Sequence, residues 1–146
     1  MKKNFFNLLL AFIGVVVLVP GVIEILLSFT RGPYTFGQIA FGGDFMLWRG
    51  LILLSSGCIY LFSINQANQI EQDAQAVSAS FMIWIVGGME LLSIVLGSVP
   101  GEGGRWVATW GTFVNSYKGP FIPSIFLLPF SIGLVMFVLY RRAKRI

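Results

Sequence analysis

The stretch FFNLLLAFIGVVVLVPGVIEILLSF, residues 5–29, decides the fold class of this chain. Its 25 residues include a single ionisable side chain, Glu24. A helix rises 1.5 Å per residue, so about 20 apolar residues cross the ~30 Å hydrocarbon core of a bilayer. Lipid offers no hydrogen-bond partners to the backbone, and a segment in this core must therefore satisfy its own. The stretch predicts a transmembrane helix.

The composition of the whole chain agrees with a membrane location. Of the 146 residues, 56% are hydrophobic and only 11% are charged, whereas a soluble domain carries about 25% charged residues. Three further apolar runs, residues 45–64, 77–99 and 121–140, are each long enough to span a bilayer. We expect a single all-α membrane domain over residues 1–146, folded as a four-helix bundle.

Residue types that are absent limit the chemistry of the chain. It contains no histidine and a single cysteine, Cys58. This excludes metal and haem sites that need a histidine ligand, internal disulfides, and nucleophilic systems that use a histidine base. We therefore expect no enzymatic activity and no cofactor ligated by this chain. A lipid, a quinone or a pigment could still lie against its apolar surface.

Basic residues predict the orientation of the spans. Lys2 and Lys3 precede the first span, and the last span is followed by a basic tail of Arg141, Arg142, Lys144 and Arg145. The opposite side carries Arg31, Arg49, Arg105 and Lys118. Six basic residues against four favour cytoplasmic termini, with the tail as an anchor at anionic headgroups. This placement of the net charge of +4 favours lipid over nucleic acid as the partner.

The three connections between the spans differ in character. The connector NQANQIEQDAQA, residues 65–76, is polar, and its Gln and Ala content predicts helical extensions of the spans. Residues 30–44 and 100–120 are rich in aromatics and should either pack on the outer face or lie in the membrane interface. In the second of these, an aromatic stripe recurs at helical spacing: Trp106, Trp110, Phe113 and Tyr117. It predicts an amphipathic interfacial helix at about 105–117, either as an anchor or as a contact for a partner or lipid.

Three ionisable residues lie inside the predicted spans, namely Glu24, Arg49 and Glu90. A charge at membrane depth is costly unless it is paired or hydrated. All three fall in the outer half of their spans, so we expect a cluster in which Glu24 pairs with Arg49 and Glu90 lies below or beside them. Glu90 would then lack an obvious partner. The cluster is either a structural ion pair or a site for a proton, a cation or a ligand headgroup.

Two functions remain open, and no motif assigns the chain to a family. The first is a non-catalytic accessory subunit of a larger complex in a plasma or energy-transducing membrane. The second is a small-ligand or proton-coupled transporter, since Glu24 resembles the membrane-embedded glutamate in the first helix of small four-span multidrug exporters. The chain departs from those exporters because Glu24 lies near a span end beside Arg49, and because its outer loops are long. We expect the accessory subunit.

Overall fold

Four long helices dominate the computed structural model, which describes residues 2–30, 33–43, 45–99, 107–115 and 117–143. All four are long and apolar enough to cross a membrane. They are α1 (Lys2–Thr30), α2 (Met46–Ser63), α3 (Gln69–Ser98) and α5 (Pro123–Ala143). Each contains one of the four predicted spans or most of it. The described chain is thus mostly helical, as the apolar runs indicate.

The helical extension predicted for the polar connector is confirmed on the side of α3 only, because α2 ends at Ser63 and residues 64–68 are not helical. Helix α3 begins at Gln69, well before the apolar run that starts at residue 77. The side chain of Asn68 caps it by accepting a hydrogen bond from the backbone N–H of Ile70 at 3.1 Å. Glu71 in the first turn interacts favourably with the positive end of the helix dipole.

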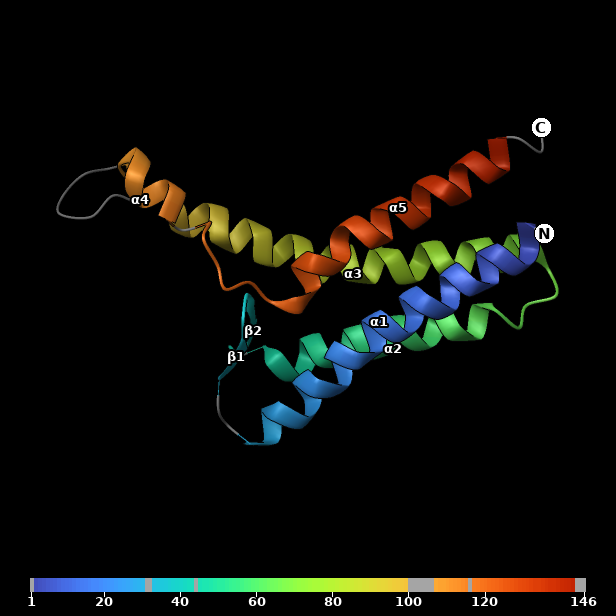
Figure 1. Ribbon diagram of the computed structural model, residues 1–146, viewed down its shortest axis with the longest axis horizontal. Coiled ribbons are helices and arrows are strands. Elements are labelled where there is room, and N and C mark those ends of the chain that lie inside the picture. The colour runs from blue at the N-terminus through green and yellow to red at the C-terminus, as the bar shows by residue number, and fades with distance from the viewer. Residues whose placement is uncertain (1, 31–32, 44, 100–106, 116, 144–146) are drawn as a thin grey trace.

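The helices pack in a row in which α1 contacts mainly α2, α2 contacts α3, and α3 contacts α5. Both termini lie at the same end of this bundle (Figure 1). That end is termed the terminal end below. The opposite end carries two short strands, β1 (Tyr34–Phe36) and β2 (Ile39–Phe41), and is termed the hairpin end. Orientation relative to a membrane is an inference from charge, taken up under the proposed function.

Glycines bring α1 and α2 into backbone contact at two levels. Gly14 and Gly21 are seven residues apart on α1, and Gly50 and Gly57 are seven apart on the antiparallel α2. A Cβ on Gly21 would lie 2.7 Å from the backbone nitrogen of Leu54, and one on Gly57 would lie 3.0 Å from the backbone oxygen of Gly14. Small residues at such positions let helices approach closely in lipid. The contacts fix the register of α1 against α2.

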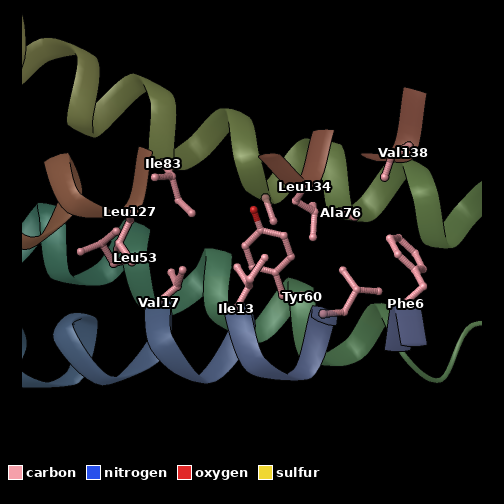
Figure 2. Close-up of a cluster of buried hydrophobic side chains, with 12 residues drawn as sticks. Phe6, Ile13, Val17, Leu53, Tyr60, Ala76, Ile83, Leu127, Leu134 and Val138 are labelled. Carbon is pink, nitrogen blue, oxygen red and sulfur yellow. The ribbon is translucent and has the colours of Figure 1, made fainter. Parts of the chain in front are cut away.

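A continuous apolar core runs along the bundle and contains a few paired polar groups. Tyr60 of α2 is fully buried among aliphatic side chains (Figure 2). Its hydroxyl lies 2.7 Å from the hydroxyl of Ser80 on α3. Ser56 donates to the backbone oxygen of Ala79 at 2.9 Å. These bonds satisfy buried polar groups across the interface of α2 and α3, where lipid offers no alternative partner.

The hairpin formed by β1 and β2 was not predicted. Gly37 in its two-residue turn has φ +60°, a left-handed conformation that favours glycine. The hairpin also contacts the segment before α5: the N–H of Ala40 donates to the oxygen of Phe121, and the N–H of Phe121 donates to the oxygen of Gln38, both at 2.8 Å. Within the described part of this loop, β2 is thus joined to the segment before α5 by backbone pairing, while the residues of β1 remain exposed.

The aromatic stripe is described in part. Helix α4 spans only Trp110–Asn115, so it is shorter than the predicted helix at 105–117, and Trp106 lies outside the described residues. The ring centroids of Trp110 and Phe113 are 5.8 Å apart, and those of Phe113 and Tyr117 are 5.1 Å apart. The Tyr117 hydroxyl lies 3.1 Å from that of Ser98 at the end of α3. These three aromatic side chains therefore form one stripe beside that end of α3.

Candidate functional site

The hairpin end contains a buried ion pair between α1 and α2. The Arg49 Nε donates to both carboxylate oxygens of Glu24, at 2.8 and 2.9 Å. Both side chains are removed from solvent, with exposed fractions of 5% for Arg49 and 0% for Glu24. Arg49 directly precedes Gly50, and Glu24 lies one turn after Gly21. The close glycine contact of α1 with α2 therefore places the two charges opposite each other.

The same arginine also contacts α3 and the loop after the hairpin. Its Nη1 donates to Oε1 of Glu90 at 3.1 Å, and its Nη2 donates to the backbone oxygen of Gly42 at 3.0 Å. The expectation that Glu90 would lack a partner is wrong, because a guanidinium offers five N–H donors and can hold two carboxylates at once. Glu90 remains 34% exposed. The structure thus brings all three sequence-predicted charges together in one hairpin-end cluster.

A glycine also allows α3 to approach α5 closely near this cluster. Gly87 lies one turn before Glu90, and a Cβ there would lie 2.9 Å from the backbone oxygen of Ser124 in the first turn of α5. This close contact sets the level at which α5 begins. The hairpin-end cluster, the start of α2 and the start of α5 therefore lie at about the same height along the bundle.

A second set of charges, the terminal-end cluster, was missed by the sequence analysis. Asp73 of α3 is only 1% exposed. Its Oδ1 lies 3.4 Å from Nη2 of Arg141, and its Oδ2 lies 3.7 Å from Nε of Arg142. Asp73 belongs to the connector that the sequence analysis described as polar, and both arginines belong to the basic tail that we expected at anionic headgroups. Asp73 shares a helix face with Ala76, Ala79 and Ile83, which the structure buries, and this spacing is the signal in the sequence that it faces inward.

The remaining residues of the basic tail, Lys144 and Arg145, lie outside the described residues. Beside the terminal-end cluster, the side-chain N–H of Gln72 donates to Oδ1 of Asn7 on α1 at 2.8 Å. Gln72 itself is fully buried. Polar side chains from α1, α3 and α5 thus meet at the terminal end.

The two clusters are separated by an apolar slab of membrane dimensions. Seventeen residues separate Asn7 from Glu24 on α1, and seventeen separate Asp73 from Glu90 on α3. At 1.5 Å per residue, either path is about 25 Å long. A bilayer has a hydrocarbon core of about 30 Å. The distance between the two clusters is therefore close to the thickness of such a core.

Beyond the hairpin-end cluster, α3 continues without covering from the rest of the described chain. None of its residues 91–97, termed the α3 extension, is buried. Leu92 and Leu96 are 56% and 62% exposed, and Trp110 of the adjoining α4 is 79% exposed. Figure 1 shows this part of α3 and α4 projecting away from the ends of α1 and α2. The described surface of the α3 extension and of α4 is thus strongly apolar.

The described residues offer no metal site, since they contain no group of three His, Cys, Asp or Glu side chains that could hold an ion. Comparisons with protein-family models, characterised proteins and solved structures give no match for this chain. A function must therefore be argued from the two charge clusters and from the exposed α3 extension.

Proposed function

We propose that this protein is a non-catalytic subunit or assembly partner of a larger membrane complex. The observation that carries the proposal is the α3 extension, an apolar helical segment with no buried residue. Glu90 is eight residues from the end of α3 at Ser98, so α3 reaches about 12 Å beyond the hairpin-end cluster. Helix α5, which packs against α3, begins near the level of the hairpin-end cluster and therefore does not cover the α3 extension.

The exposed apolar surface of the α3 extension, beyond the hairpin-end cluster, favours a protein partner. With the two clusters near the boundaries of the hydrocarbon core, the α3 extension lies in or above the headgroup layer. Large apolar patches exposed to water are rare on proteins that act alone. Ser93 and Gly97 form a small-xxx-small step that permits close helix contact. Trp110 and the aromatic stripe add side chains of the kind that dominate interface energetics.

The orientation follows from charge. Lys2, Lys3, Arg141 and Arg142 belong to the terminal end, so the positive-inside rule favours cytoplasmic termini and a partner that meets the α3 extension on the outer face. A plasma or energy-transducing membrane is the setting we propose. The lipid bilayer contacts the remaining apolar surface.

Site-specific photo-crosslinking tests the proposal in the native membrane. A photoreactive amino acid replaces Leu96 in the α3 extension, and a control places it at Leu8 on α1, where the side chain is similarly exposed at 68%. We expect Leu96, and not Leu8, to give a discrete adduct with another protein. Native mass spectrometry after gentle detergent extraction should find that protein at a fixed ratio to this chain.

Two outcomes would overturn the proposal. The first is that both positions crosslink only to lipid, which would make the α3 extension an ordinary lipid-facing surface. The second is that the extracted protein migrates as a free monomer or homodimer under conditions in which other membrane complexes stay intact.

A second candidate function is proton-coupled transport, favoured by the incomplete burial of Glu90. The single positive charge of Arg49 can balance only one of the two carboxylates. Arg49 bonds one oxygen of Glu90, and the Glu90 side chain is 34% exposed, so a proton can reach its other oxygen. Vesicles loaded with a pH-sensitive dye and containing the purified protein should then take up protons, and Glu90→Gln should abolish the uptake. Uptake equal to that of empty vesicles would rule out this candidate.

A further inference from the structure

We propose that Arg142 binds the phosphate of an anionic phospholipid at the terminal end of the bundle. The proposal is independent of the accessory-subunit function. It rests on the different environments of two consecutive arginines, on the unequal charge of the terminal-end cluster, and on an apolar strip along α5 that leads to Arg142.

Arg141 is a structural residue of the bundle. It is 13% exposed, its Nη2 lies 3.4 Å from Oδ1 of Asp73, and its guanidinium carbon lies 4.3 Å from the ring centroid of Phe6. A cation over an aromatic face and beside a carboxylate is held from two sides. Arg141 therefore serves as the buried counter-ion of Asp73.

Arg142 has a different environment although it is the next residue. Its side chain is 50% exposed, and its ion pair with Asp73 is made through Nε at the longer distance of 3.7 Å. The two Nη atoms carry four of the five guanidinium N–H donors. An Nε contact leaves these four donors for a ligand outside the bundle, and a planar fork of donors matches the oxygens of a phosphate.

The balance of charge at the terminal end specifies the sign of the charge that a ligand should carry. Asp73 can neutralise only one of the two guanidinium groups. Lys2 and Lys3 belong to the first turn of α1, which lies at the same end of the bundle (Figure 1). Glu71 is the one other acidic residue of this end. The surplus is positive, so an anionic headgroup is favoured over a zwitterionic one, whose own cation would be repelled.

An apolar strip on α5 provides the place for an acyl chain. Ile132, Met136 and Leu139 follow the i, i+4, i+7 spacing of one helix face, and they are 49%, 63% and 55% exposed. Leu139 lies one turn before Arg142. A phospholipid whose phosphate meets Arg142 can therefore lay one chain along this strip, toward the centre of the bilayer.

Native mass spectrometry of the purified full-length protein tests the site. The protein is titrated with phosphatidylglycerol and with phosphatidylcholine of the same acyl chains, and the ratio of the two affinities is the readout. One basic residue near an anionic surface contributes about 1 kcal/mol, so we expect Arg142→Gln to lower the ratio roughly fivefold. The control Lys118→Gln removes an exposed positive charge at the hairpin end and should leave the ratio unchanged.

An unchanged ratio in Arg142→Gln would overturn the proposal, as would an equal loss in Lys118→Gln, which would indicate unspecific attraction to surface charge. A thermal unfolding scan of each variant shows whether it is folded. If Arg142→Gln does not fold, the wild-type protein is titrated at low and at raised salt. The preference for phosphatidylglycerol must then fall with salt, and a constant preference would contradict a phosphate contact.

Discussion

The two charge clusters of this bundle are built in opposite ways. At the hairpin end a single arginine lies between two carboxylates, and all three nitrogens of its guanidinium make hydrogen bonds of 2.8 to 3.1 Å. At the terminal end a single carboxylate lies between two arginines, at 3.4 and 3.7 Å. The buried oxygens of Asp73 and Oε1 of Gln72 have no hydrogen-bond partner within the described part of the chain.

The difference has a geometric cause. A guanidinium is a flat fork with five donors pointing in fixed directions, so helices on several sides can each supply one acceptor. A carboxylate that is shared by two bulky arginines on consecutive residues of one helix cannot align with both. The hairpin-end cluster is therefore expected to be rigid and important for stability. The terminal-end cluster has longer ion pairs, and its half-exposed Arg142 is the residue for which we propose a phosphate contact.

The largest effect should come from Arg49→Met, which leaves the buried carboxylate of Glu24 without its partner. Breaking a buried pair by removing one member costs about 3–5 kcal/mol. Denaturant unfolding in detergent measures the loss, with Leu51→Ala, a half-exposed site on the same helix, as the control. Adding Glu24→Gln should recover part of the stability, because it removes the unpaired charge. A loss below that of the Leu51 variant would show that the cluster is not structural.

A somewhat smaller loss is expected for Gly21→Ala, which tests whether glycine contacts hold the hairpin-end cluster in register. The added methyl would lie 2.7 Å from a backbone nitrogen of α2, and overpacking of this kind costs about 1–3 kcal/mol. The matched variant is Gly133→Ala on α5, where a Cβ would meet nothing within 4 Å. Equal unfolding midpoints for the two variants would mean that the contact between α1 and α2 accommodates the methyl and does not require glycine at position 21.

Asp73→Asn is expected to cost less than Arg49→Met although Asp73 is buried, because its ion pairs are long and one partner is half-exposed. The asparagine keeps one acceptor oxygen for Arg141. Denaturant unfolding in detergent, as for Arg49→Met, measures this loss of stability. A loss as large as that of Arg49→Met would show that the two clusters contribute equally to stability, contrary to the difference inferred from their geometry.

The smallest effect should be that of Glu90→Gln, within about 0.5 kcal/mol. The side chain is 34% exposed, and the glutamine oxygen can still accept from Nη1 of Arg49. The variant should extract and migrate like the wild-type protein in native electrophoresis. A strongly destabilised Glu90→Gln would show that the second carboxylate is as structural as the first.

Much of this architecture could be predicted from the pattern of residues. Apolar runs locate the four spans, and the polar composition of residues 65–76 correctly predicts that the helix extends into the connector. The cost of charge in lipid marks out Glu24, Arg49 and Glu90 as residues that need partners. The hairpin at residues 34–41 was missed although its turn at Gly37 is a local signal. Its pairing with Phe121 could not be predicted, since it joins segments about 80 residues apart and depends on where α5 begins.

What the sequence determines by itself is local: the length and apolarity of each span, the helical spacing of the aromatics, and the presence of costly charges. The tertiary structure alone decides which charges meet. Arg141 and Arg142 are adjacent and chemically identical, and only the packing of α5 on α3 and α1 buries one over Phe6 and leaves the other at the surface. Neighbouring side chains on a helix point about 100° apart, so their surroundings depend on what packs beside each.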